Sequence, residues 1–206
     1  MEDKLTPSRM EAFSDGVIAV IITIMVLEIH VPTRDISNLD GLRHIAPILV
    51  VYLLSFIQVG IYWVNHHYLV DDLQQITHGI LWSNLALLFC LSLIPAATAW
   101  MGERGLTPFS IALYAAVCIV PAIPWFVLSM LICAHSGIAP ANSLLKTALS
   151  ASSYLCAILG AHFSTWISLG FIALVAVIWL IPPKRVVEQT RAQSRWRQDH
   201  DPLPRD

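Results

Sequence analysis

The chain has 206 residues, of which 56% are hydrophobic and 13% are charged, with a formal net charge of -2 and a mean hydropathy of +0.67. A soluble domain carries about 25% charged residues, and a surface this apolar would expose patches that monomers in water rarely tolerate. The composition therefore excludes a soluble globule, a disordered or fibrous chain and a nucleic-acid-binding domain, and it predicts an integral membrane protein.

Polar segments rich in Pro, Gly and charge divide the chain into six apolar stretches, each near the 20 or so residues that a membrane-spanning helix needs. We expect spans at residues 12–31, 45–69, 78–101, 108–134, 142–162 and 163–182. Pro121 and Pro124 should kink the fourth span. Residues 160–164 should form the turn of a tight hairpin between the fifth and sixth. The predicted fold class is all-α, with residues 1–183 as one six-helix transmembrane domain.

Lysine and arginine positions predict the orientation of these spans. If both termini are cytoplasmic, nine basic residues lie on the inner side: Lys4, Arg9, Lys146, Lys184, Arg185, Arg191, Arg195, Arg197 and Arg205. The remaining three, Arg34, Arg43 and Arg104, then lie outside. This excess obeys the positive-inside rule. Residues 184–206 mix charges with few apolar residues and are expected to form a cytoplasmic tail.

Catalytic and metal-binding patterns are not visible in the sequence. The four cysteines lie singly inside apolar stretches, at Cys90, Cys118, Cys133 and Cys156, where buried thiols are expected instead of disulfides or a zinc site. His66 and His67 are adjacent, so on a helix they point about 100° apart and do not easily share a metal ion. Neither GxSxG nor HExxH occurs. We expect no enzyme, no metal site and no cofactor.

Polar side chains of the first three spans gather at one depth, in the inner leaflet. They are Arg9, Ser14, Asp15, Asn65, His66, His67 and Asn84. Because unpaired polar groups are costly inside a membrane, we expect a hydrogen-bonded cluster of Arg9, Ser14, Asp15, Asn65, one of the histidines and Asn84. The alternative is that Ser14 and Asp15 cap the first helix, while Arg9 and the histidines belong to the membrane interface.

The motif RxxxFSDG, formed by Arg9, Phe13, Ser14, Asp15 and Gly16 at the head of the first span, resembles the signature of the transmembrane-protein-175 family of potassium channels. The segments 27–29 (Leu-Glu-Ile) and 63–67 (Trp-Val-Asn-His-His) are also similar to that family. The resemblance covers residues 9 to about 105. It implies a prokaryotic single-repeat member with six spans, a multi-pass protein of the cell membrane.

This resemblance implies a homotetramer in the bilayer whose four first helices line a central pore for monovalent cations, with K⁺ the permeant ion. The sequence has no TVGYG-like filter segment. In the family, bulky side chains of the first helix narrow the pore, and the matching positions here are Val20, Thr23, Ile24 and Leu27. Their spacing places them on one helical face, although an apolar stripe of this kind also suits a lipid-facing or core position.

Within this interpretation, a ring of Thr23 hydroxyls would contact the cation, and rings of Val20 and Leu27 would form a hydrophobic gate. Val20 is smaller than the residue usual at that place in the family, which predicts a wider constriction, and thus either weaker discrimination of K⁺ over Na⁺ or a leakier closed state. Glu28 either concentrates cations at the outer mouth or is simply a hydrated helix end.

The resemblance also gives the polar motif a structural role, to hold the first helix beside its neighbours. The motif residues are Arg9, Phe13, Ser14, Asp15, Gly16, Trp63, Asn65, His66 and His67. The alternative function is a secondary transporter of a small solute or ion, but no charged residue lies at the midplane of any predicted span, where such proteins place their sites.

Overall fold

The computed structural model describes residues 6–30, 37–71, 73, 75–136 and 144–180. These residues form helices and connecting turns, and no strand occurs among them. The elements are α1 Pro7–Ile24, the 3-10 helix η1 Met25–Glu28, α2 Asn38–Val70, α3 His78–Arg104, α4 Pro108–Ile119, α5 Ala122–Ser136, α6 Leu144–Gly160 and α7 Thr165–Leu180. The expected tail at 184–206, and the expected span ends at residues 31, 142–143 and 181–182, lie outside the described residues.

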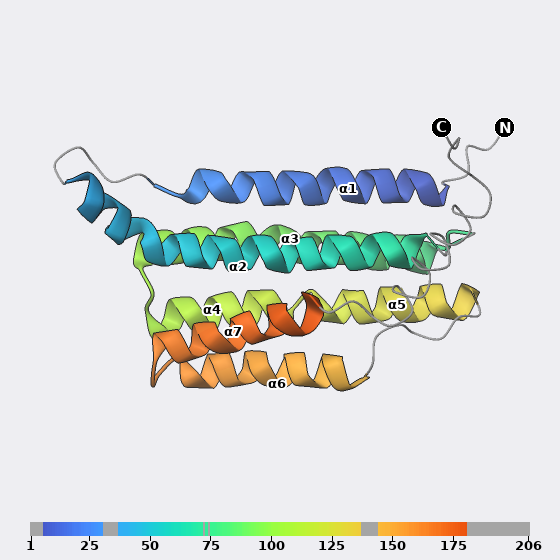
Figure 1. Ribbon diagram of the computed structural model, residues 1–206. Helices are drawn as coiled ribbons and strands as arrows, with labels where there is room; N and C mark the ends of the chain where they lie inside the picture. Colours follow the sequence, from blue (N-terminus) through green and yellow to red (C-terminus); the bar gives the residue numbers. More distant parts are fainter. Residues whose placement is uncertain (1–5, 31–36, 72, 74, 137–143, 181–206) are drawn as a thin grey trace, which may run out of the picture.

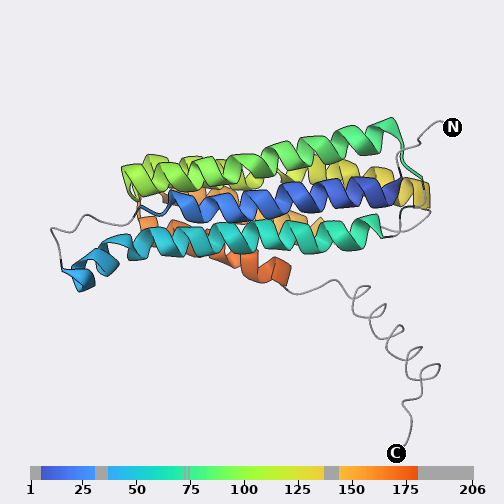
Figure 2. The ribbon, with the colours of Figure 1, turned by 90° about the horizontal axis from the view of Figure 1, so that it is seen from above.

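The helices run along one common direction in a layered bundle (Figure 1). α2 and α3 form the middle of the bundle, with α1 on one side and α4, α5, α6 and α7 on the other. Figure 2 shows α1 lying between α2 and α3, and it packs against both. α6 and α7 pack against each other as a hairpin. In the described part of the chain, the face of α1 that points away from α2 and α3 is therefore left uncovered.

Four stretches of helix are long and apolar enough to cross a membrane: Pro7–Glu28, Asn38–Val70, His78–Arg104 and Pro108–Ser136. α7 is apolar but shorter. Large apolar side chains lie exposed on the outside of the bundle, such as Phe89 on α3 and Phe109 on α4. Lipid tails accommodate such a surface, whereas water does not. The prediction of an all-helical membrane protein is confirmed.

Buried side chains form two apolar clusters, and α2 and α3 contribute to both. One joins α1 to α2, α3 and α5, with Ile18, Met25, Ile80, Leu91 and Leu128 at its centre. The other joins α4, α6 and α7 to α2 and α3, through Val51, Met101, Tyr114, Ala157 and Ile172. α1 is thus fixed by one face only, and this determines which of its side chains remain available to a pore.

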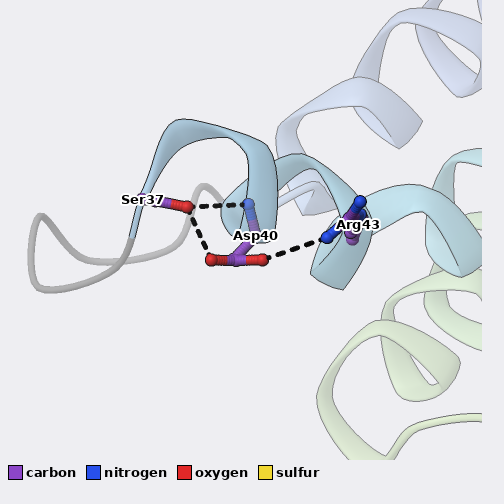
Figure 3. Close-up of polar contacts among 3 residues, drawn as sticks. All are labelled: Ser37, Asp40 and Arg43. Carbon is purple, nitrogen blue, oxygen red and sulfur yellow. Dashed lines mark hydrogen bonds and ion pairs between the residues drawn. The ribbon is translucent and has the colours of Figure 1, made fainter.

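Several helix boundaries differ from the expected spans because polar turns extend the helices beyond their apolar parts. α1 begins at Pro7, after Thr6 in extended conformation, since proline suits the first helical turn. α2 begins at Asn38, where the Ser37 hydroxyl accepts a hydrogen bond from the Asp40 backbone N–H at 3.2 Å and donates one to the Asp40 carboxylate at 2.6 Å (Figure 3). Such caps stabilise a helix by about 1 kcal/mol. The exposed Asp40–Arg43 pair, 3.4 Å apart, adds little.

Glycine and proline mark other helix ends, but not uniformly. α3 ends at Arg104, and Gly105 follows with φ +74°, a conformation that glycine adopts without strain. The helical segment of residues 108–136 is interrupted between Ile119 and Ala122, next to Pro121, because proline lacks an N–H and its ring clashes with the preceding turn. By contrast, Pro47 and Pro95 lie inside α2 and α3.

Candidate functional site

The exposed face of α1 and η1 carries the four side chains that the sequence analysis assigned to a pore. Val20 is 54% exposed, Ile24 42% and Leu27 74%, and Thr23 is exposed beside them. The side chains that point the other way, toward α2 and α3, are buried: Ile18, Ile21 and Met25. Packing thus decides which apolar residues of this helix are free, and it leaves the expected stripe uncovered.

Thr23 is the polar member of this stripe, and its hydroxyl group is already oriented by the helix. Its Oγ1 donates to the carbonyl oxygens of Ala19 at 2.9 Å and Val20 at 3.0 Å. The hydroxyl hydrogen therefore points back along the helix, which leaves the oxygen lone pairs as acceptors. A cation needs acceptors only, so this geometry is compatible with ion contact.

On its buried side, α1 is joined to α3 and α2 by a continuous chain of side-chain hydrogen bonds. The Asn84 amide Nδ2 donates to Ser14 Oγ at 2.9 Å, and Ser14 Oγ donates to the Met10 carbonyl at 2.9 Å. His66 Nε2 lies 2.7 Å from Asn84 Oδ1. Ser14, His66 and Asn84 are all buried. Three helices are thereby linked through one asparagine.

These hydrogen bonds also determine which ring nitrogen of His66 carries the hydrogen. Since Asn84 Oδ1 can only accept, His66 Nε2 must carry the hydrogen. His66 Nδ1 has no hydrogen-bond partner among the described residues. A bare lone pair at Nδ1 is cheaper to bury than an unpaired N–H, so this arrangement favours the neutral ring with its hydrogen on Nε2.

A second pair of contacts connects α1 to α2 nearer the surface. Trp63 Nε1 donates to Asp15 Oδ1 at 2.9 Å, and His67 Nδ1 lies 2.8 Å from Glu11 Oε1. Glu11 and Asp15 are four residues apart on α1, as are Trp63 and His67 on α2. Because α1 and α2 are antiparallel, the two pairs form side by side. The Trp63 and His67 rings stack with centroids 6.5 Å apart.

The expected cluster is therefore divided in two. Ser14, His66 and Asn84 come together, whereas Asp15 contacts Trp63, and the Asn65 amide donates to the Ile61 carbonyl of its own helix at 2.7 Å. The alternative that Ser14 caps α1 is wrong, because α1 begins two turns earlier.

The other motif residues lie on exposed parts of α1. Arg9, Phe13 and Gly16 are exposed, and a Cβ atom added at Gly16 would meet no atom of the described chain within 4 Å. The contact of Glu11 with His67 was missed by the sequence analysis. The matched four-residue spacings of Glu11 with Asp15 and of Trp63 with His67 are the signal that could have found it.

Beside the exposed stripe, a groove of about 800 Å³ runs between α1 and α2. Asp15, Thr23, Gly60 and Trp63 lie along it, and most of its other lining residues are apolar. On α1, the polar side chains that line this groove are those of Asp15 and Thr23. Among the residues that the structure describes, no three His, Cys, Asp or Glu side chains are grouped to hold a metal ion.

Comparisons with known proteins match this arrangement. A family model described as "Endosomal/lysosomal potassium channel TMEM175" matches residues 9–95. The chain is 44% identical over 190 residues to a protein of Chryseobacterium sp. (strain P1-3) named as a potassium channel, which covers 88% of this chain and 96% of that protein. It is 33% identical over 100 residues to the human "Endosomal/lysosomal proton channel TMEM175", covering 43% of this chain and 20% of the human protein.

A solved structure is also similar, the crystal structure of a lysosomal potassium-selective channel TMEM175 homolog from Chamaesiphon minutus. It superposes with a TM-score of 0.68 at 26% sequence identity, covering 85% of this chain and 96% of that one. The resemblance inferred from the RxxxFSDG motif is confirmed. The 44% identity over nearly the whole length of the Chryseobacterium protein shows that the chain belongs to the TMEM175 family. This is a family of ion channels and not of enzymes.

Proposed function

We propose that this protein is a potassium-permeable channel of a prokaryotic cell membrane, in which four copies surround a pore lined by α1. The observation that carries the proposal is the uncovered face of α1 and η1, where Val20, Thr23, Ile24 and Leu27 are exposed on a helix fixed from behind by buried hydrogen bonds. Bacterial relatives named as potassium channels support the same function.

The need to enclose this face supports an oligomer, and the family resemblance implies that it has four copies. One copy of α1 cannot surround an ion path, but cyclic symmetry would bring four copies of the same stripe to one axis. The groove between α1 and α2 adjoins the stripe and would receive a helix of the neighbouring copy. The open space at Gly16 lies on the same helix.

Six spans with both termini in the cytoplasm complete the proposal. α6 and α7 have 17 and 16 residues, about 25 Å each at 1.5 Å per residue. This is a little short of the hydrocarbon thickness of about 30 Å, a mismatch that local thinning of the bilayer accommodates. The excess of basic residues at the inner side supports this orientation.

Permeation in this proposal depends on hydrophobic constrictions and not on a filter of backbone carbonyls. Rings of Leu27 and Val20 would exclude water when narrow and admit it when wide. Between them, a ring of Thr23 oxygens would replace part of the hydration shell of the ion. The Ser14–Asn84–His66 chain and the Asp15–Trp63 contact would hold the four helices at a fixed distance from the axis.

The test of the function is current through a planar bilayer that contains the purified protein. We expect unitary currents carried by K⁺, at rates far above transporter turnover, and a complex with the mass of four 22.9 kDa subunits by light scattering in detergent. Saturable uptake without unitary currents would instead indicate a transporter. A monomeric mass would contradict the shared pore.

Replacing Val20 by leucine should increase the preference of the channel for K⁺ over Na⁺. The extra methylene at this exposed position narrows the constriction, so ions must lose more water to pass, and the smaller hydration energy of K⁺ then favours it. The measurement is the reversal potential in mixed K⁺ and Na⁺ solutions, with Leu155→Val on the exposed face of α6 as a control. An unchanged reversal potential for Val20→Leu would place the constriction elsewhere.

A further inference from the structure

The exposed face of α1 continues toward the N-terminal end of the helix, beyond the four residues that were assigned to the pore. Phe13 is 56% exposed, nearly the same fraction as the 54% of Val20. These two residues are seven positions apart, and positions seven apart on an α-helix differ by only about 20° in direction. The phenyl ring of Phe13 therefore lies on the same face of α1 as Val20, and it is the one large aromatic side chain there.

Hydrogen bonds on both sides of Phe13 fix the direction in which its ring points. Ser14, the next residue, is buried and accepts a hydrogen bond from Asn84 of α3 at 2.9 Å. Asp15 accepts one from Trp63 of α2, also at 2.9 Å. A rotation of α1 that buried Phe13 would break both contacts. The ring is therefore held away from the bundle, toward whatever faces α1.

Between Phe13 and Val20, the exposed face carries no bulky side chain. Gly16 lies on this face, and a Cβ atom added there would meet no atom of the described chain within 4 Å. Ala19 is exposed beside it. Seven residues of helix correspond to about 10 Å at 1.5 Å per residue. In the proposed tetramer, this face would line a wide section about 10 Å long, with Phe13 at one end and Val20 at the other.

We propose that four Phe13 rings form a second constriction of the pore, at its cytoplasmic entrance, separated from the Val20 ring by the wide section at Gly16. This inference rests on the proposed function, since it requires four copies of α1 around one axis. The face of a phenyl ring attracts cations, so Phe13 narrows the entrance and also contacts the ion there. Phe13 thus acts on permeation directly, and not through the hydrogen bonds of the motif to which it belongs.

The test places a charge of either sign at position 13 and measures unitary K⁺ currents of the full chain in a planar bilayer. Phe13→Cys is made in a Cys156→Ser background, because Cys156 is the exposed cysteine of the native chain. Methanethiosulfonate reagents in both chambers attach either a sulfonatoethyl or a trimethylammonioethyl group, and the mass of the intact chain confirms the attachment. Fixed charge beside an ion path concentrates or repels cations, so the sulfonate should raise the unitary current about 1.5-fold or more and the ammonium should lower it by a similar factor.

The matched control is Leu149→Cys in the same background. Leu149 is 48% exposed on α6, which lies on the opposite side of the bundle from α1 (Figure 1), so neither reagent should change the unitary current. Phe13→Trp tests the constriction without chemical modification. A larger ring at the same place should reduce the unitary K⁺ current about twofold, whereas Leu149→Trp should leave it unchanged.

The outcomes separate this inference from the proposed function. Unchanged unitary currents with both reagents, a change in the same direction with both, or a native current in Phe13→Trp would each overturn the role of Phe13. If Leu27→Asn still raised the flux in that case, the pore along α1 would stand without a constriction at Phe13. A complete lack of unitary K⁺ currents in the Cys156→Ser protein would instead reject the proposed function, and this inference with it.

Discussion

Leu27→Asn should raise the potassium flux of reconstituted protein several-fold. Leu27 is the most exposed member of the α1 and η1 stripe, at 74%. In the proposed tetramer, four leucines narrow the path at this level and expel water, which no ion can cross without losing its hydration. Four asparagine side chains would supply donors and acceptors at the same place, so the constriction would stay wet. The measurement is K⁺-driven dye flux in liposomes, with unitary currents as a second readout.

The matched control is Leu155→Asn, which makes the same substitution at an exposed position on α6. It faces away from the proposed axis and should leave the flux unchanged. Equal flux for Leu27→Asn and the native protein would place the gate away from η1. A rise in both variants would indicate leakage through a destabilised bundle and would also contradict the assignment.

Asn84→Leu should destabilise the protein by about 1–3 kcal/mol. The substitution removes the side chain that bonds both Ser14 and His66. Ser14 keeps its hydrogen bond to the Met10 carbonyl, but the buried N–H of His66 is left without an acceptor. Interhelical hydrogen bonds in membranes contribute roughly 0.6 kcal/mol on average, so most of the loss comes from the group left behind. The measurement is the free energy of unfolding in detergent, with Ser92→Ala as an exposed control on the same helix.

A triple variant separates these two sources of stability. The variant replaces Ser14 by alanine, His66 by phenylalanine and Asn84 by leucine. These changes remove all the hydrogen bonds among the three side chains and leave none of their polar groups unpaired. The triple variant should be more stable than Asn84→Leu alone, because replacing all partners by apolar groups is often nearly neutral. A triple variant less stable than the single one would show that the bonds themselves carry the stability.

The sequence was most informative about the membrane environment and the family of the protein. Composition alone indicated a membrane protein, and the RxxxFSDG motif at residues 9–16 indicated the family. Helix ends were less predictable, since hydropathy detects apolar length and not the polar turns that precede it. The Ser37 cap and the proline at position 7 each start a helix before its apolar part.

The hydrogen-bond partners could not be predicted from position along the chain. Asn65 and His66 are neighbours, yet one bonds its own helix and the other reaches Asn84. Successive residues point about 100° apart on a helix, and a hydrogen bond requires its atoms within about 3 Å. A small rotation of α2 therefore decides which residue takes part.

The sequence by itself determined the membrane environment, the helical class, the family and the stripe of α1 that the family assigns to a pore. These follow from side-chain hydrophobicity and from local spacing. Only the tertiary structure decided that this stripe is the uncovered face of α1, that Phe13 shares this face, and that Asp15 meets Trp63. Each of these depends on how helices far apart in the chain are rotated and aligned against one another, and no local pattern records that.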